Sequence, residues 1–469
     1  MKTKSDTAYL YHLIELEGDL YTPIQIFQIL SGTKKFILES SAKHKESGRY
    51  SFIGRNPFGE IKGTGPDTII SFLDSTQHKQ GGQLTTLFDT IKTFEDLSLP
   101  FPFPFAGGGI GYIGYDVIRQ IEKIGKVPED SLQMPDVHFM LYDQLVVFDH
   151  IEEKLSLLSL NLGHQLSQDE LKNKNQELKK EIEAGVYQRE EDTLARQNLS
   201  FNSNIEKEKF KENVVKAKEY ITAGDIFQVV ISQRLEAKFT GNPFLYYRKL
   251  RKENPSPYMY FIDFSDYVVL GTSPESLVKA HGEGLTTNPI AGTRKRGATA
   301  EEDENLQKEL LSDEKELAEH NMLVDLSRND LGRVCKTGSI GLTKYLQVER
   351  YKFVMHLVSE VKGIRRKAVN NDEVLAACLP AGTVSGAPKI RAMQIINELE
   401  QSKRGLYSGA VGYIGFNGDF DLALAIRTMI VKEEKAYVQA GAGIVYDSDP
   451  ETEYEETMNK AKALLEVKQ

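Results

Sequence analysis

The chain has 469 residues, of which 40% are hydrophobic, 27% charged and 9% aromatic, and these values are typical of a folded globular protein. They exclude a disordered, collagen-like or membrane-embedded chain, and the length allows roughly two to four domains. With 58 Lys and Arg against 68 Asp and Glu, the formal net charge is -10. This excess of acid argues against nucleic acid or an anionic membrane as the main partner, because phosphate binding needs a concentrated basic surface.

Cysteine usage and the first residues indicate where the protein acts. The two cysteines, Cys335 and Cys378, are too few for a disulfide framework or a tetrahedral zinc site, so we expect a reducing compartment, the cytoplasm. The first twenty residues contain no continuous apolar core, which argues against a signal peptide. No window reaches the roughly 18 apolar residues that a membrane span needs.

The composition along the chain predicts three segments. Residues 1–163 contain short β-rich runs separated by turn residues, which indicate a sheet with a few helices. Residues 164–205 are dense in charge and poor in large apolar side chains, as in a solvated helix followed by a linker. Residues 206–469 combine strand-like runs with long amphipathic helices.

The individual runs decide the fold class. Strand-like runs cover residues 35–38, 50–53, 144–148, 229–231, 267–270 and 436–439, and amphipathic helices lie near 306–333, 388–402 and 451–466. Because strands and helices mix without regular βαβ alternation, we predict an α+β fold with mainly antiparallel sheets.

One short sequence occurs twice in similar form. Residues 108–115 read GGIGYIGY and residues 409–416 read GAVGYIGF. We expect both to be glycine-rich strands that let another backbone approach closely. The first copy also contains GxGxxG, but FPFPF precedes it instead of a β-branched strand, so a dinucleotide-binding loop is not favoured.

Two pairs of acids suggest a cation site. Glu316 and Glu319 are three residues apart in one predicted helix, and Glu453 and Glu456 have the same spacing in the last helix, so each pair lies on one helix face. Magnesium accepts such oxygen ligands. Solvated helix faces carry acids at this spacing often, and the spacing alone leaves both interpretations open.

Three further segments could carry chemistry. Residues 379–389, LPAGTVSGAPK, form a loop of small residues that leads into a helix, which suits either an anion site or a plain helix start. The turn at 440–443 exposes backbone amides that could hold a carboxylate, or serves only as a tight strand exit. His356 has apolar neighbours on both sides, so it is either a core histidine or a catalytic one.

These segments, in this order, resemble the chorismate-utilising enzymes, and within them the anthranilate synthase component I family. The resemblance covers nearly the whole chain. Its motifs are LES at 38–40, GRYSFIG at 48–54, NPSPYM at 254–259, GTSPESL at 271–277, PIAGTR at 289–294, AEHNMLVDLSRND at 318–330, the 379–389 loop, GAVGY at 409–413 and AGAGIV at 440–445. The family implies a large layered α/β/β/α sandwich with mainly antiparallel sheets.

The resemblance also implies a reaction. Chorismate and ammonia would give anthranilate and pyruvate, the first committed step of tryptophan biosynthesis. The chain has neither the extra length nor a cysteine nucleophile for an amidotransferase domain, so a separate glutamine amidotransferase subunit would deliver the ammonia. Mg²⁺ is the implied cofactor, with Glu319 and Glu456 as direct ligands and Glu316 and Glu453 acting mainly through water.

The family assigns further residues by motif. Glu275 would donate a proton to the departing hydroxyl, His356 would assist the second step, and Gln228 would favour ammonia over water, because an amide cannot act as the base that activates water. The remaining substrate contacts would come from Thr383, Tyr407, Arg427, Gly441 and Gly443, and from Lys460 beside the acids.

The N-terminal segment resembles the family's regulatory portion, where tryptophan acts as a feedback inhibitor. Glu39 could pair with its amino group, and apolar residues could enclose the indole. The effector residues implied are Leu38, Glu39, Ser40, Asn254, Pro257, Tyr258, Met259, Val411 and Tyr413.

Three alternatives compete with this interpretation. Aminodeoxychorismate synthase component I, of the folate pathway, uses the same substrate and nucleophile, but commonly carries Lys where this chain has Ala291. Isochorismate and salicylate synthases usually carry Lys in place of Gln228. A catalytically inactive tryptophan sensor is a third possibility, against which the complete set of acids and His356 argue.

Overall fold

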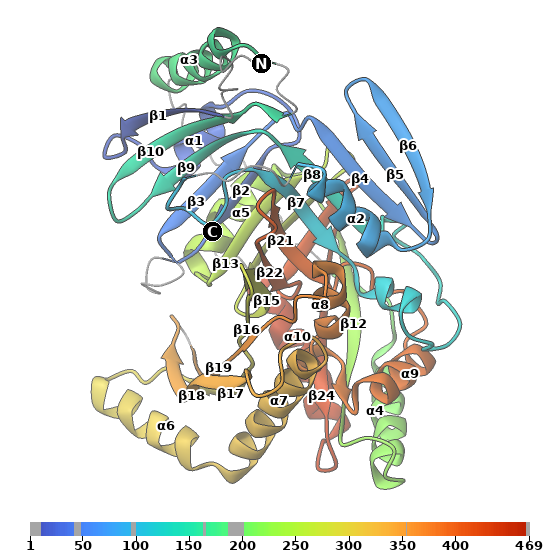
Figure 1. The fold of residues 1–469 in the computed structure, drawn as a ribbon. Coiled ribbons are helices and arrows are strands. Elements are labelled where there is room, and N and C mark those ends of the chain that lie inside the picture. Colours follow the sequence, from blue (N-terminus) through green and yellow to red (C-terminus); the bar gives the residue numbers. More distant parts are fainter. Residues whose placement is uncertain are drawn as a thin grey trace.

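A computed structural model of the chain describes residues 11–41, 48–94, 100–162, 166–185, 201–352 and 354–465. These residues form two large sheets, and all pairs of named strands within them are antiparallel (Figure 1). The predicted α+β fold with antiparallel sheets is confirmed.

The first sheet has 12 strands. In spatial order they are β1 (Tyr11–Glu17), β10 (Lys154–Leu160), β9 (Gln144–Asp149), β3 (Tyr50–Gly54), β2 (Phe36–Glu39), β13 (Tyr258–Asp263), β14 (Tyr267–Ser273), β23 (Thr428–Lys432), β24 (Lys435–Ile444), β12 (Gln228–Lys238) and β11 (Asn202–Ser203), with β20 (Gly386–Ala387) also paired to β12. Each strand-like run that we predicted in residues 35–38, 50–53, 144–148, 229–231, 267–270 and 436–439 lies mainly or wholly within one of these strands.

The second sheet also has 12 strands. In spatial order they are β17 (Ile290–Lys295), β19 (Val354–Ile364), β16 (Gly284–Thr287), β15 (Ser276–His281), β22 (Phe420–Leu424), β21 (Ala410–Gly415), β7 (Gly108–Ile113), β8 (Val137–Tyr142), β4 (Gly59–Thr64), β5 (Asp67–Phe72) and β6 (Ser75–Gln80), with β18 (Gly341–Arg350) also paired to β19.

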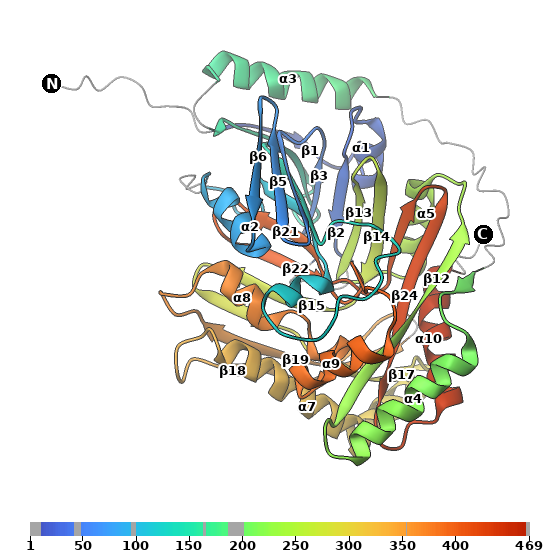
Figure 2. The ribbon, with the colours of Figure 1, turned by 90° about the vertical axis from the view of Figure 1, so that its right-hand side faces the viewer.

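Helices cover the outer faces of the two sheets. They are α1 (Pro23–Ile29), α2 (Gln83–Lys92), α3 (Gln168–Ala184), α4 (Lys207–Thr222), α5 (Pro243–Glu253), α6 (Ala300–Ser312), α7 (Glu314–Gly332), α8 (Asn371–Cys378), α9 (Lys389–Leu399) and α10 (Pro450–Leu465), with short 3-10 helices η1 (Tyr115–Gln120) and η3 (Gly382–Val384). In Figure 2, α2 and α8 lie on one side of the sheets and α4, α5 and α10 on the other.

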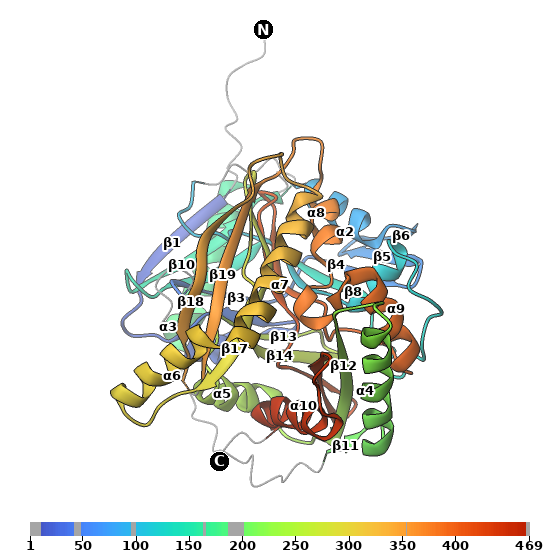
Figure 3. The same cartoon turned by 90° about the horizontal axis from the view of Figure 1, so that it is seen from below.

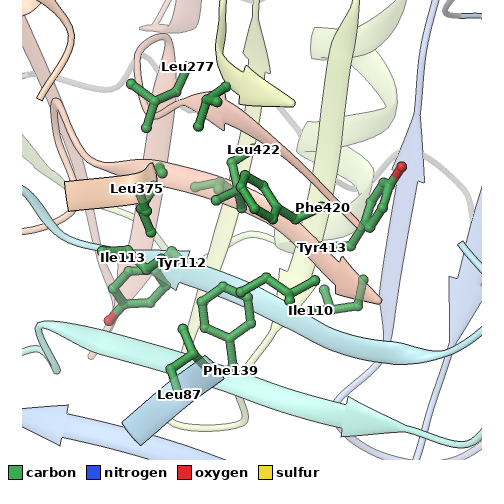
Figure 4. Close-up of a cluster of buried hydrophobic side chains, with 14 of the residues drawn as sticks. Leu87, Ile110, Tyr112, Ile113, Phe139, Leu277, Leu375, Tyr413, Phe420 and Leu422 are labelled. Carbon is green, nitrogen blue, oxygen red and sulfur yellow. The ribbon is translucent and has the colours of Figure 1, made fainter. Parts of the chain in front are cut away.

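The main core lies where the sheets face each other, and alternation along the strands builds it. In β13, Tyr260 and Ile262 belong to the core between the sheets, whereas Met259 and Phe261 belong to the cluster under α1 and α5. Figure 4 shows part of the first cluster, with Phe139 and other side chains of the second sheet gathered around it. Each sheet therefore has one face toward the other sheet and one toward helices.

Both sheets contain strands from both predicted segments. In the first sheet, β2 pairs with β13, and in the second, β7 pairs with β21. Residues 1–163 and 206–469 therefore share one core. The regulatory role expected for the first segment and the catalytic role expected for the second remain predictions. Between the two segments, Ser167 caps the start of α3 through a capping box, while residues 164–165 and 186–200 of the predicted linker region lie outside the described residues.

The two similar glycine-rich sequences pair with each other. They form most of β7 and β21, and Gly111 lies opposite Gly412. A Cβ atom on Gly111 would lie 1.9 Å from the carbonyl oxygen of His138, and one on Gly412 would lie 2.1 Å from that of Asp421. The close backbone approach expected from the sequence is confirmed.

The predicted helix near 306–333 is two helices, α6 and α7. Asp313 separates them, because its side chain accepts hydrogen bonds from the backbone N–H groups of Lys315 and Glu316 at 3.0 and 3.1 Å and so starts a new helix. Within the described ranges, no helix is long and apolar enough to cross a membrane.

Candidate active site

A cavity of about 540 Å³ opens where β12, β24, η3, α7 and α10 meet. Figure 3 shows α7 and α10 from below, with β12 close to α10. Every residue to which the resemblance assigned a catalytic, substrate-binding or metal-binding role lines this cavity: Gln228, Glu275, Glu316, Glu319, His356, Thr383, Tyr407, Arg427, Gly441, Gly443, Glu453, Glu456 and Lys460. The fold thus brings residues that are more than 200 positions apart in the sequence into one cavity.

Glu275 is the carboxyl group with the most unusual environment in the cavity. It lies in the short connection between β14 and β15 and is only 6% exposed, and its Oε1 accepts a hydrogen bond from Thr383 Oγ1 at 2.8 Å. Burial raises the pKa of Glu275 to about 8, although the bond from Thr383 opposes this rise. A protonated carboxyl at neutral pH is a competent proton donor.

Gln228 begins β12 and reaches the acids of α7. Its Nε2 donates a hydrogen bond to Glu319 Oε1 at 3.0 Å, while its Oε1 is buried with no partner among the described residues. A Cβ atom on Gly443 would lie 2.7 Å from the same Nε2, so glycine at 443 leaves room for the amide. The free oxygen is an acceptor available to a small N–H donor inside the cavity.

The four acids line the same cavity, with Lys460 beside them. Burial raises the pKa values of Glu319 and Glu453. Glu456 pairs with Lys460 at 2.6 Å, and Lys460 also donates to the carbonyl oxygen of Gly441 at 3.0 Å. In the part of the chain that the structure describes, no three Asp, Glu, His or Cys side chains are close enough together to hold a metal ion.

Two residues of the 289–294 motif support this site, and the sequence did not single them out. Thr293 Oγ1 lies 2.9 Å from His356 Nδ1, and the Arg294 guanidinium donates to Glu316 Oε1 at 2.9 Å. Both residues belong to the PIAGTR motif, so the motif could have pointed to them. Their contacts with the site could not be read from it, because the pairing of β17 with β19 is what places Thr293 opposite His356.

His356 and Arg427 line the same cavity as the acids. Burial lowers the pKa of His356 to about 4, so the imidazole is neutral at pH 7. Arg427 adopts a left-handed backbone conformation, with φ of 47°, in the turn before β23. Its guanidinium forms no ion pair with any described residue, and burial lowers its pKa. An unpaired guanidinium in a cavity is suited to a carboxylate ligand.

Tyr407 closes the wall beside β24. The side chain is 9% exposed, and burial raises its pKa to about 12, so it remains a neutral hydroxyl. A Cβ atom on Gly441 would lie 2.7 Å from the Tyr407 hydroxyl. Glycine at 441 thus keeps the backbone amides of β24 accessible beside the tyrosine.

The expected effector residues come together around the β2–β13 pair. Met259 lies opposite Glu39, and the Ser41 N–H donates to the Ser256 carbonyl at 3.1 Å. Asn254 and Pro257 belong to the connection between α5 and β13, and Val411 and Tyr413 come from β21 of the other sheet. Leu38 packs against the core between the sheets, and the Ser40 hydroxyl is buried without a partner among the described residues.

Glu39 already has partners within the protein, and its expected pairing with the amino group of tryptophan stays a prediction. Its carboxylate accepts hydrogen bonds from Tyr247 Oη and Arg251 Nη2, both at 2.8 Å, and is 6% exposed. The alternation of side chains in β2 turns it toward α5, away from the face that carries Leu38. This geometry favours Glu39 as an anchor between β2 and α5, because its carboxylate is already satisfied there.

The residues of the 379–389 loop divide between two environments. Thr383 and Val384 line the cavity. Lys389, which we considered as part of an anion site, instead pairs with Asp330 at 2.7 Å. Its charge is therefore balanced outside the cavity.

Comparison with known proteins gives concordant matches. The family described as chorismate binding enzyme matches residues 33–466. Anthranilate synthase component 1 of Lactococcus lactis subsp. lactis (strain IL1403) is 49% identical over 460 residues, covering 97% of this chain and 99% of the relative. The crystal structure of anthranilate synthase component I from Streptococcus pneumoniae TIGR4 superposes with a TM-score of 0.82 at 45% identity, over 96% of this chain and 98% of that one. The menaquinone-specific isochorismate synthase from Escherichia coli shares the fold, with a TM-score of 0.72 at 19% identity, over 98% and 95% of the two chains.

Proposed function

We propose, because this chain belongs to the chorismate binding enzyme family, that it is the large component of an anthranilate synthase, a lyase of tryptophan biosynthesis. It would convert chorismate and ammonia into anthranilate and pyruvate. The observation that carries the proposal is that a protonated Glu275, the neutral amide of Gln228 and Arg427, which has no ion pair with a described residue, line one cavity. The names of the relatives support this function over the folate-pathway alternative.

Substrate binding would use the two charged ends of the cavity. Arg427 would bind the enolpyruvyl carboxylate through its planar fork, next to the Tyr407 hydroxyl. Thr383 and the backbone of Gly441 and Gly443 would donate hydrogen bonds to the rest of the substrate. Chorismate carries two carboxylates, so an arrangement with a cation at each end of the cavity suits it.

Proton transfers would follow from the protonation states. Glu275 would give its proton to the hydroxyl that leaves from C4 as water, while ammonia adds at C2 and loses a proton. In the second step the C2 proton leaves, the ring becomes aromatic, and the enolpyruvyl group departs and takes up a proton as pyruvate. His356, neutral at pH 7, could assist this step near the enolpyruvyl ether.

The acidic end fits a magnesium ion in its chemistry. Glu319, Glu456, Glu316 and Glu453 offer only carboxylate oxygens, which Mg²⁺ prefers. Neighbouring carboxylates also contribute to the raised pKa values of Glu319 and Glu453, and a cation bound there would offset this repulsion. Glu319 and Glu456 would hold the ion directly, and Glu316 and Glu453 through water. When bound, Mg²⁺ would supply positive charge that stabilises the ring carboxylate and the acids.

Three further parts of the proposal concern the setting of the enzyme. A glutamine amidotransferase subunit would supply ammonia, tryptophan would inhibit by binding near β2 and β13, and the protein would act in the cytoplasm. Both cysteines are free and buried, which suits a reducing compartment.

The test is direct formation of the product. The purified chain, incubated with chorismate, Mg²⁺ and ammonium salt at alkaline pH, should produce the fluorescence of anthranilate. An aminodeoxychorismate product without fluorescence would support the folate-pathway alternative, and the absence of any product would refute the proposed function.

Metal dependence is tested in the same assay. Excess chelator should abolish turnover and added Mg²⁺ should restore it, because the clustered acids would otherwise repel the substrate carboxylates. Glu319→Gln should lose about 100-fold or more in turnover while remaining folded. Turnover that persists in excess chelator would remove the metal from the proposal.

A further inference from the structure

We propose that Arg404 is a positioning residue, which acts from behind the cavity wall to hold three elements of the active site in place. This inference rests on the proposed function and extends it to a residue that does not line the catalytic cavity. It is based on the hydrogen bonds and ring contacts that surround the buried guanidinium of Arg404.

The first two contacts join a loop to a strand. Arg404 Nη1 donates to the carbonyl oxygen of Val384 at 2.7 Å, and Nη2 donates to that of Val230 at 2.8 Å. Val384 follows Thr383 in η3, and Val230 lies two residues after Gln228 in β12. One guanidinium therefore sets the distance between the element that carries Thr383 and the strand that carries Gln228.

The third contact is with an aromatic wall. The guanidinium carbon of Arg404 lies 5.5 Å from the ring centroid of Tyr407 and 5.1 Å from that of Tyr115. These distances are typical of cation–π contacts. Tyr407 lines the cavity, whereas Tyr115 is buried behind it, so Arg404 holds the Tyr407 ring from the side opposite the substrate space.

The charge of Arg404 is balanced within the same cluster. Its Nε and Nη2 donate to the two carboxylate oxygens of Glu400 at 2.8 and 2.6 Å, and Glu400 also accepts from the backbone N–H and hydroxyl of Ser232. The Arg404 side chain is 1% exposed and that of Glu400 8%. Burying such a pair gives little net stability compared with apolar packing, so its value lies in the geometry that it specifies.

Lysine cannot reproduce this geometry. Its ammonium is a point charge, whereas the planar fork of arginine reaches Glu400 and two carbonyl groups at once and also stacks on rings. Arg404→Lys should therefore keep the charge but release Val384 or Val230.

The experiment compares Arg404→Lys with Lys403→Met, a matched change in the preceding residue. Lys403 pairs with Asp130 and Asp136 and does not line the cavity. We expect kcat for anthranilate formation to fall about 10- to 100-fold in Arg404→Lys, since small misplacements of catalytic groups cost this much. The KM for chorismate should change little, and kcat of Lys403→Met should equal that of the wild type.

A double mutant distinguishes positioning from a general loss of structure. If Arg404 acts through Thr383, the loss of kcat caused by Arg404→Lys should be at least about tenfold smaller in a Thr383→Ala background than in the wild type. The inference would be overturned if Arg404→Lys lowered kcat by the same factor in the Thr383→Ala background as in the wild type. It would also be overturned if the Arg404→Lys protein had the kcat of the wild type. If Arg404→Lys does not fold, Glu400→Gln takes its place with the same expected coupling and the same overturning result. A wild type that makes no anthranilate would instead refute the proposed function.

Discussion

A carboxyl group can donate a proton at neutral pH only where its surroundings keep it protonated, and Glu275 meets this condition through burial. The side chain is 6% exposed and its one side-chain hydrogen bond comes from a neutral hydroxyl, so nothing nearby stabilises the carboxylate strongly. The acids of α7 and α10 belong to the same cavity but have different partners, namely Gln228, Arg294 and Lys460. Glu275 and these acids are all glutamates, so their surroundings, and not the residue type, distinguish the proton donor from the candidate metal ligands.

The pH dependence of Glu275 gives a prediction at this scale. Its folded-state pKa of about 8 exceeds the ordinary value of 4.5, so the folded protein keeps a proton that the unfolded chain loses in this range. The free energy of unfolding should therefore fall as the pH rises from 4.5 to 8. The rate, expressed per concentration of free ammonia, should fall as the pH rises through about 8, because the donor is lost.

Glu275→Gln tests both consequences. Turnover should fall about 100-fold or more, since the amide cannot donate an acidic proton, whereas stability at pH 8 should equal or exceed that of the wild type. Turnover would be measured by anthranilate fluorescence and stability by urea unfolding. Glu283→Gln, an exposed acid on the neighbouring hairpin, is the control and should change neither. Normal turnover in Glu275→Gln would exclude Glu275 as the proton donor.

Gln228 gives a second prediction, on the choice of nucleophile. A neutral amide can orient ammonia but cannot deprotonate water, whereas a partly desolvated lysine can act as a base. Gln228→Lys should lower anthranilate formation about tenfold or more, because the new ammonium would also pair with Glu319, and a trace of isochorismate can appear.

Chromatography of the products would measure this outcome. Gln228→Met is the matched control, because it removes the amide without adding a base and should give no isochorismate. Anthranilate formed at the parent rate by Gln228→Lys would show that residue 228 does not govern the nucleophile.

At the scale of elements, strand pairing decides which motifs meet. β2 and β13 lie side by side in the first sheet, so residues 38–40 and 257–259 become neighbours although they are far apart in the chain. β13 leads into β14, and Glu275 lies two residues after the end of β14. The candidate effector region and the proton donor are therefore joined by one hairpin, a short route by which binding at one could affect the other.

Ser40→Phe tests the effector region. The buried Ser40 hydroxyl has no partner among the described residues, and a phenyl ring there should occupy the space that tryptophan needs. Inhibition by tryptophan should decrease at least about tenfold, while turnover without tryptophan stays near normal because the two sites are distinct. The measurement is the tryptophan concentration for half inhibition. Ser75→Phe on exposed β6 is the control, and unchanged inhibition in a folded Ser40→Phe protein would place the effector site elsewhere.

At the scale of the whole molecule, residues 1–163 and 206–469 form one body because each contributes strands to both sheets. Such a shared core makes independent folding of either segment unfavourable, since each would expose sheet edges and half of a core. The glutamine amidotransferase subunit that would supply ammonia remains part of the proposal.

The source of ammonia gives the prediction at this scale. The purified chain should use ammonium salt at alkaline pH, where free ammonia is abundant, and should give no anthranilate from glutamine. Addition of the cognate amidotransferase subunit should confer glutamine-dependent turnover near neutral pH. Turnover of glutamine by the single chain would contradict this division of the reaction between two subunits.

Periodicity in the sequence was enough to predict the α+β class and the antiparallel sheets, and the resemblance carried by the ordered motifs named residues that line the cavity. Both are local signals: alternation identifies strands such as β14, and acids three apart share a face of α7 whatever surrounds them. The identity of the Glu275 motif could likewise be recognised without coordinates, because its residues are consecutive.

Only the tertiary structure decided which of these residues share an environment. The burial that protonates Glu275, the turn of Glu39 toward α5 and the cluster around Arg404 all depend on elements distant in sequence. Asp313 divides a helix that the periodicity continued. Its capping partners are local, but the guanidinium of Arg294 in β17 also binds its carboxylate at 2.6 Å, and this contact depends on the fold. The pKa of a side chain and its hydrogen-bond partners are set by the groups packed around it, and a linear pattern does not specify those groups.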